Sequence, residues 1–419
     1  MRRLGGLVID IAPLRTSRAF RYAFAARLIS LLGIGLLIVA VPAQMYQLTR
    51  SNLHVAGASV VLAAAMFAGS LAGGVLADRF DRRRTIQFSR TAAGLGFLVL
   101  GVNATLDHPA VWVIYVAAAI DGLAGGVSST ALMALTPALV GRDKMAAAGA
   151  LVTLTTDLGT MVTPALAGVI IAAGGVSVTY FVAAATTAIT VTLFQEVGPS
   201  APPEMARETP LRALLTGLRF AMGERTIRGV LIVGLVVMLA SGPTVLLPAF
   251  VDQVLHAGPA TLGLLYGAPA VGAVVGTLTS GWTGNVRRSG RALLASMLLL
   301  PIGYLILGGA GSAATGAAAV AFLGLAGFGL ARAVNDIFRF AVLQHSTPDE
   351  LRGRVSSLWL IQAVTGTALG SMTAGVLGQY FAPDTALLVY GLGVVVISAV
   401  LFATLTAVRS ATAPEPVEV

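Results

Sequence analysis

Charged side chains inside apolar segments are the residues of this sequence best suited to chemistry. Arg27 lies in "FAARLISLLG", Asp121 in "AAAIDGLAGG" and Asp157 in "LVTLTTDLGT". Arg332 and Asp336 lie four residues apart in "GLARAVNDIF", a spacing that lets them pair along one helical face. Because a charge in an apolar environment is costly, such residues are candidates for proton transfer or for binding a polar ligand. The alternative is a set of static buried pairs that only order the helices.

The composition explains what surrounds these charges. Of 419 residues, 56% are hydrophobic and 11% are charged, whereas soluble domains carry about 25% charged residues. So few charges exclude a soluble enzyme. The net charge of +9 is dispersed between apolar runs, so we expect no nucleic-acid binding. The chain has no cysteine, which excludes disulfides and thiol catalysis.

Apolar runs long enough to cross a membrane recur along the whole chain. A span needs about 20 apolar residues. The sequence predicts twelve spans, at about 22–46, 55–77, 85–104, 111–135, 145–170, 175–195, 227–250, 259–280, 291–310, 315–341, 355–380 and 383–405. Basic residues gather in the N-terminal tail and the even-numbered loops, whereas the odd-numbered loops hold only Arg50. This asymmetry predicts that both termini are cytoplasmic.

The two halves of the sequence resemble each other. "GSLAGGVLADRFDRRR" at 69–84 aligns with "GTLTSGWTGNVRRSGR" at 276–291, an offset of 207 residues. Six spans followed by a parallel copy of six are typical of transporters. We therefore predict an all-α membrane protein of two pseudo-symmetric six-helix bundles. The predicted parts are an N-terminal bundle, a cytoplasmic linker with an amphipathic helix, a C-terminal bundle and a disordered tail, at 1–195, 196–226, 227–408 and 409–419.

The segment "GGVLADRFDRRRTI" at 73–86 resembles the signature loop of the major facilitator superfamily, which joins spans two and three. Asp81 stands where that pattern has glycine. Further segments, including "IDGLAGGVSSTALMALTPALVGRD" and "HSTPDELRGRVSSLW", are similar to the enterobactin exporter branch of the superfamily. The similarity covers roughly 13–405.

This resemblance implies proton-coupled export of a small molecule by alternating access, with a siderophore such as enterobactin as the leading substrate. The resemblance also implies that the protein lies in the inner membrane of a bacterium. We expect it to be a monomer without a cofactor. A multidrug or macrolide antiporter of the same fold is the alternative, and a non-transporting sensor or scaffold is a third hypothesis. No P-loop is present, because the only lysine lies in "VGRDKM", so ATP is not the expected energy source.

The resemblance also implies roles for particular residues. The signature loop is expected to gate the cytoplasmic side, through Gly74, Asp78, Arg79 and Arg82. The alternative is that these charges only set topology and face anionic lipid. Spans one, four, seven and ten line the cavity in this superfamily. Candidates for substrate contact are therefore Arg27, Gln44, Arg332 and Asp336, together with Gln362 of the eleventh span, which would lie near the cavity helices.

Asp121 is the first candidate for proton coupling. It stands where many proton-coupled relatives have arginine in an Arg-x-x-x-Gly pattern, and Gly125 matches that glycine. Burial and a nearby arginine change the proton affinity of a carboxyl group in opposite directions, and we expect Arg27 to face Asp121 across the bundle. A static buried pair of Arg27 and Asp121 is the alternative. Asp157 is a further candidate for coupling.

Span five carries a degenerate form of the antiporter motif. Its positions are Gly159, Thr163, Pro164, Ala167 and Gly168, and the two that depart from the motif, Thr163 and Ala167, stay small. The proline removes one helical hydrogen bond and the small residues allow close crossing. The motif favours export, although ordinary small-residue packing would also explain it. The four histidines lie near loops without the spacing of a metal cluster, so no metal site or catalytic constellation is expected.

Overall fold

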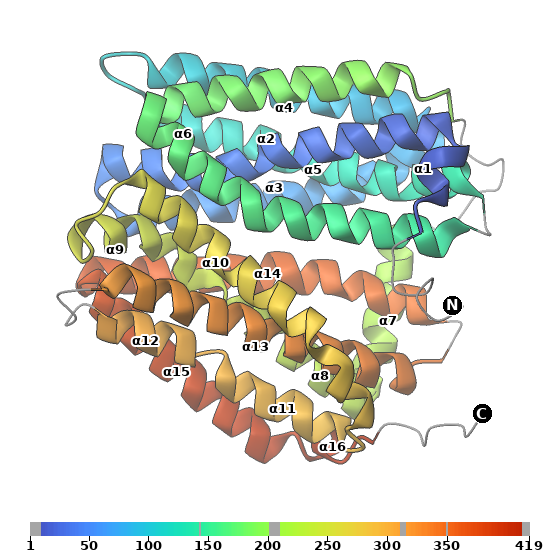
Figure 1. Cartoon of the computed structure of the whole chain (residues 1–419). Coiled ribbons are helices and arrows are strands. Elements are labelled where there is room, and N and C mark those ends of the chain that lie inside the picture. The colour runs from blue at the N-terminus through green and yellow to red at the C-terminus, as the bar shows by residue number, and fades with distance from the viewer. Residues whose placement is uncertain (1–9, 142–143, 201–209, 311–315, 349–350, 413–419) are drawn as a thin grey trace, which may run out of the picture. The chain divides into compact units, whose positions relative to one another are not determined.

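The computed structural model describes residues 10–141, 144–200, 210–310, 316–348 and 351–412, and its regular elements are all helices (Figure 1). A helix satisfies its backbone hydrogen bonds within one segment, which is what an apolar chain in lipid requires. The predicted all-helical class is therefore confirmed for the described residues. The predicted tail at 409–419 falls largely outside them.

The chain divides into two compact units. The first consists of Met1–Gln44 and Ala64–Arg207, and the second of Met45–Ala63 and Glu208–Val419. The first unit holds α1 (Ala12–Thr16), most of α2 (Arg18–Thr49), the end of α3 (Asn52–Arg79), α4 (Arg82–Ala104), α5 (Val111–Val140) and α6 (Met145–Gln195). Within it, α4 packs against both α5 and α6.

The second unit begins, apart from residues 45–63, with the linker helix. Its elements are α7 (Pro210–Gly223), α8 (Arg225–Leu239), η2 (Gly242–Leu246), α9 (Leu247–Gln253), α10 (Pro259–Leu278), η3 (Ser280–Asn285), α11 (Ser289–Leu299), α12 (Ile302–Ala310), α13 (Ala317–Ser346), α14 (Arg352–Tyr380), α15 (Pro383–Thr404) and α16 (Thr406–Arg409). Helix α13 packs against α10, α11 and α12, and α14 packs against α8. The helix expected in the linker is α7.

Ten segments of the described chain are long and apolar enough to cross a membrane. One of them, the 51-residue α6, contains two helices that meet at Gly175, whose φ of 80° breaks the helix. Glycine adopts this left-handed conformation without the steric cost that a side chain would bring. With the two parts of α6 counted separately and with α14 added, the described helices correspond to the twelve predicted spans.

The internal repeat reappears in how the helices cross. In the first unit, Gly69 of α3 packs against the backbone of Leu123 of α5. In the second unit, Gly276 of α10 packs against Leu330 of α13. Gly276 and Leu330 each lie 207 residues after their counterparts Gly69 and Leu123. The sequence repeat therefore corresponds to a repeated helix–helix contact.

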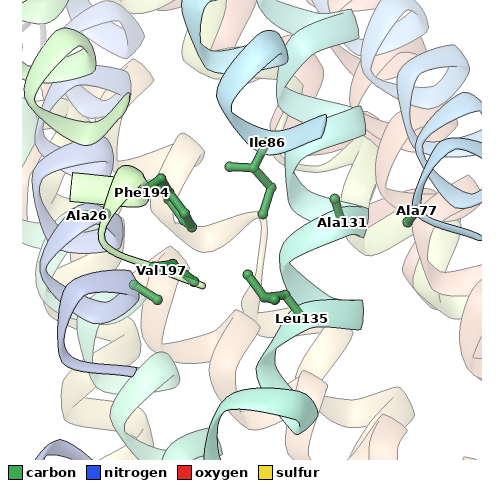
Figure 2. Close-up of a cluster of buried hydrophobic side chains, with 8 residues drawn as sticks. Ala26, Ala77, Ile86, Ala131, Leu135, Phe194 and Val197 are labelled. Atoms are coloured by element: carbon green, nitrogen blue, oxygen red, sulfur yellow. The ribbon is translucent and has the colours of Figure 1, made fainter. Parts of the chain in front are cut away.

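A cluster of buried side chains lies beside the signature loop. Figure 2 shows Ile86, Leu135 and Phe194, the last from the end of α6, around one centre, with Ala77 at the edge of the cluster. Small residues at Ala26 and Ala131 let α2 and α5 come close to this cluster. Five helices thus hold the two ends of the loop in place.

Candidate functional site

The signature loop is fixed by its own charged side chains. Asp81, the residue that replaces the family's glycine, caps the N-terminus of α4, where its carboxylate accepts a hydrogen bond from the backbone N–H of Arg84 at 3.2 Å. Arg82 is buried and donates from Nε to the carbonyl of Ala77 at 3.3 Å and from Nη1 to that of Ala134 at 3.0 Å. Arg82 therefore ties the loop to the end of α5.

The other predicted gating residues are differently placed. Asp78 and Arg79 are exposed at the end of α3. Among the described residues, Asp78 has no hydrogen bond or ion pair, so its carboxylate is available to a further group. Gly74 is half-buried, and the glycine that meets α5 beside it is Gly73, where a Cβ would lie 2.7 Å from the Cα of Val127. The gating role of Gly74, Asp78 and Arg79 stays a prediction.

Arg27 is held by hydroxyl groups. Its Nε donates to Thr155 Oγ1 at 3.3 Å and its Nη2 to Thr156 Oγ1 at 3.0 Å, so the guanidinium of α2 is anchored on α6. The described residues contain no ion pair between Arg27 and Asp121. Arg27 and Asp121 therefore do not form the direct pair that the static alternative requires, and their facing across the bundle stays a prediction.

The arginine that interacts with Asp121 is Arg90, on α4. It lies close enough to Asp121 and to Arg27 for their charges to interact. Sequence reasoning missed Arg90, although it stands in the predicted span 85–104 and the rule that selected Asp121 would have selected it too. The first unit thus combines Arg27, Arg90 and Asp121 from three helices in one polar cluster, the N-cluster.

The second unit contains a matching group, the C-cluster. Asp336 lies between two arginines of α13. Its Oδ1 accepts from Arg339 Nη2 at 2.7 Å, and its Oδ2 lies 3.8 Å from Arg332 Nε. Arg339 is 1% exposed, and its guanidinium stacks on Trp359 of α14 at 3.7 Å from the ring centre. Arg339 Nε and Nη1 have no hydrogen-bond partner among the described residues.

Arg332 and Gln362 connect the C-cluster to η2 and α8. Arg332 is partly exposed and donates from Nη1 to Ser241 Oγ at 3.2 Å. The buried amide of Gln362 donates to the carbonyl of Leu231. A side chain at position 234 would displace both groups, because a Cβ there would lie 2.5 Å from Arg339 Nη1 and 2.7 Å from Gln362 Oε1. The structure therefore brings the predicted residues Arg332, Asp336 and Gln362 together.

The antiporter-like motif lies against α2. Thr163 donates to the carbonyl of Gly159 at 2.6 Å, next to the buried Pro164 and Gly168. A Cβ at Gly159 would lie 3.3 Å from Leu31, and one at Gly35 would meet Thr163. Small residues on both helices thus permit a close crossing. This crossing is consistent with the antiporter motif and equally with ordinary small-residue packing.

Two predicted residues stand apart from both clusters. Gln44 is 2% exposed and accepts a hydrogen bond from the hydroxyl of Tyr180 at 2.8 Å, so it joins α2 to the second part of α6. This buried contact leaves its amide oxygen engaged within the protein. Asp157 is exposed on α6, one residue beyond the Thr156 that holds Arg27. The described residues contain no group of three or more metal-type ligands.

Comparison with known proteins places this arrangement in a family. Residues 9–416 match the family model described as transmembrane secretion effector. The chain belongs to the transmembrane secretion effector family of major facilitator transporters. It is therefore a multi-pass membrane transporter of the secretion type and not an enzyme.

Curated relatives match the transporter over almost its whole length. It is 38% identical to the enterobactin exporter EntS of Citrobacter koseri, over 98% of this chain and 97% of the relative. It is 37% identical to EntS of Shigella boydii, over 96% and 95%. The resemblance found in the sequence is thus confirmed over the full chain.

Solved structures show the same fold at low sequence identity. A POT family transporter in complex with 5-aminolevulinic acid matches with a TM-score of 0.74 and 12% identity, over 94% of this chain and 97% of that one. A bacterial homologue of the iron transporter ferroportin in an inward-facing state matches with a TM-score of 0.67 and 17% identity, over 93% and 99%. The major facilitator fold predicted for the transporter is therefore confirmed.

Proposed function

We propose that the transporter exports a siderophore of the enterobactin class from the cytoplasm in exchange for protons. The observation that carries this proposal is the identity of 37–38% to enterobactin exporters over nearly the full length of both chains. The proposed place is the inner membrane of a bacterium, with both termini cytoplasmic, where the arginine-rich loops favour the cytoplasmic side. We propose a monomer, because each charged cluster is built within one unit.

The charges of the two clusters support an anionic or catechol-bearing substrate. The N-cluster combines Arg27 and Arg90 with Asp121, and the C-cluster combines Arg332 and Arg339 with Asp336. Each has two guanidinium groups for one carboxylate, so a positive charge is left over in each unit. Guanidinium groups bind carboxylate and phenolate oxygens through several N–H donors at once. A cavity for apolar drugs would not require this excess.

Arg332 is the guanidinium best placed to receive such a group. It is partly exposed, and its Nε lies 3.8 Å from Asp336, whereas Arg339 holds the same carboxylate at 2.7 Å. Because Arg339 satisfies Asp336, a substrate oxygen can take over Arg332 without leaving the carboxylate unpaired. Arg332 therefore acts as the substrate anchor in this proposal, and Arg339 positions Asp336.

Asp121 is the proposed proton carrier. A catechol hydroxyl donates a hydrogen bond, which an ionised carboxylate accepts and a protonated one accepts less well. A proton and a catechol would then compete for Asp121, as an exchanger requires. Arg90 contributes a positive charge that interacts with the carboxylate of Asp121.

The test is secretion by iron-starved bacteria that lack their own enterobactin exporter. Intact siderophore in the medium is quantified by mass spectrometry, with the wild-type transporter and its Arg332→Gln and Arg332→Lys variants expressed at equal membrane levels. We expect the wild type to restore secretion, the glutamine variant to lose most of it and the lysine variant to retain part. Drug susceptibilities are measured in parallel.

The outcomes distinguish the two substrate classes and test whether Arg332 contacts the substrate. Restored secretion that depends on the charge at position 332 supports siderophore export through the C-cluster. Raised drug tolerance without secretion would replace the proposal by the multidrug alternative. Secretion that is equal in the wild type and the glutamine variant would keep the substrate but remove Arg332 from its path.

A further inference from the structure

A groove of about 540 Å³ lies between α3, α4 and α5 in the first unit. One stripe of α4 lines it, from Asp81 and Arg84 through Phe88 to Ala92. From Arg84 to Ala92 a helix rises about 12 Å. The groove therefore leads from the signature loop into the depth that the apolar part of the span occupies.

The two ends of the groove differ in chemistry. Asp81, Arg84 and Thr85 lie at the loop end, whereas the deeper part is lined by apolar residues such as Ile120 and Leu123 of α5. A ligand that follows the groove must therefore have a polar head and an apolar body. The apolar lining of the groove is elongated along α4, so it fits an acyl chain better than a compact solute.

Among the charged side chains that line the polar end, Arg84 is the one without a partner in the part of the chain that the structure describes. Arg82 is already engaged by the carbonyls of Ala77 and Ala134, and Asp81 is engaged by the N-terminus of α4. The side chain of Arg84 is exposed and has no ion pair with any residue that the structure describes. A guanidinium group at the edge of the hydrocarbon region attracts a phosphate.

The apolar part of the groove is open along one side. Phe88 is 80% exposed and Phe80, at the end of α3, is 57% exposed. Two exposed phenylalanine rings beside one groove form an apolar surface that is unfavourable in contact with water. In a membrane-spanning unit, lipid buries such a surface.

From this arrangement we propose that the groove is a binding site for one anionic phospholipid. Its phosphate pairs with Arg84, and one acyl chain lies along α4 beside Phe88, in contact with α3 and α5. The lipid would link the three helices that carry the signature loop and the N-cluster. This proposal does not depend on which substrate the transporter exports.

The experiment places a reporter in the groove. Phe88→Trp is reconstituted into phosphatidylcholine bilayers that contain a small fraction of phosphatidylglycerol, with brominated acyl chains on one or the other lipid. Bromine quenches a tryptophan that it touches, and the signal of the native tryptophans is subtracted with the wild-type chain. Val99→Trp, another exposed position of α4 that does not line the groove, is the matched reporter control.

We expect quenching at position 88 to favour phosphatidylglycerol over phosphatidylcholine, with no such preference at position 99. Adding Arg84→Gln should lower the preference about fivefold, which corresponds to about 1 kcal/mol per arginine. Arg84→Lys should keep most of it, and Arg288→Gln, an exposed arginine of the second unit, should leave it unchanged.

Two results would overturn the proposal. Equal quenching by both lipids, unchanged by Arg84→Gln, would mean that the groove holds only the ordinary lipid of the bilayer. A tryptophan at position 88 that neither lipid quenches would mean that protein covers the groove.

Discussion

The buried arginine of the C-cluster leads to a sharp prediction about stability. Asp336→Ala removes the carboxylate that accepts from Arg339 at 2.7 Å and leaves a guanidinium that is 1% exposed. Removing one partner of a buried ion pair typically costs 3–5 kcal/mol. Asp336 is itself partly exposed and Trp359 retains its cation–π contact, so we expect the lower end, about 3 kcal/mol.

The chain provides a matched control in the same unit. Arg50 and Asp252 approach to 2.6 Å, but their side chains are 66% and 49% exposed. Exposed pairs contribute about 0–1 kcal/mol, so Asp252→Ala should change stability little. The measurement is the free energy of unfolding in mixed detergent micelles, followed by tryptophan fluorescence, for both single variants.

A double variant separates the buried charge from the lost contact. Asp336→Ala with Arg339→Met replaces the unpaired guanidinium by an apolar side chain that can still pack on the ring of Trp359. We expect this double variant to be more stable than Asp336→Ala alone. Equal losses for Asp336→Ala and Asp252→Ala, or no recovery in the double variant, would refute the reasoning that burial makes Arg339 dependent on Asp336.

Three further predictions concern transport and the loop. Asp121→Asn should abolish substrate accumulation driven by a pH gradient while exchange down a concentration gradient continues in proteoliposomes; uphill transport that survives would exclude Asp121 as the proton carrier. Asp78→Asn should lower the turnover rate more than the affinity for substrate, and an unchanged rate would leave the loop with a role in topology only. Arg82→Ala should lower the free energy of unfolding by about 2–3 kcal/mol, since two charge-assisted hydrogen bonds are lost, whereas the exposed Arg79→Ala should have little effect; equal losses would contradict the assigned contacts.

The spans of the protein could be predicted because they follow from local properties. Apolar length fixes each span, whereas the orientation that the arginine pattern indicates stays a prediction. Even the division of α6 was visible, since the predicted spans 145–170 and 175–195 meet where Gly175 breaks the helix. The helix in the linker was found for the same reason, as α7.

The partners of charged side chains could not be predicted in this way. Each residue turns a helix by about 100°, so an uncertainty of one or two residues in rotation decides which neighbour a side chain meets. Arg27 therefore turned out to meet the threonines of α6, and Arg90 took the place expected for it beside Asp121. Gln44 lies on the expected helix, but its side chain is directed at Tyr180 inside the unit.

Residues within one helix were easier to combine. Arg332 and Asp336 are four apart, so their pairing follows from helix geometry alone. The contacts that hold this pair, from Trp359 and Gly234, come from other helices and have no local signature. The sequence thus indicates where the C-cluster lies along the chain. It does not indicate which of its charged side chains is buried.

The repeated crossing of helices also records how a duplicated interface has diverged. At Gly69 a Cβ would lie 2.8 Å from the Cα of Leu123, whereas at Gly276 it would lie 3.2 Å from both the Cβ of Ala333 and the carbonyl oxygen of Leu330. Both copies meet backbone, but the copy in the second unit is the looser one by a few tenths of an ångström. A single polypeptide therefore carries a tighter and a looser version of one repeated contact, so alanine should destabilise the protein less at position 276 than at position 69. Among natural variants of this chain, the second unit is where such drift would accumulate first.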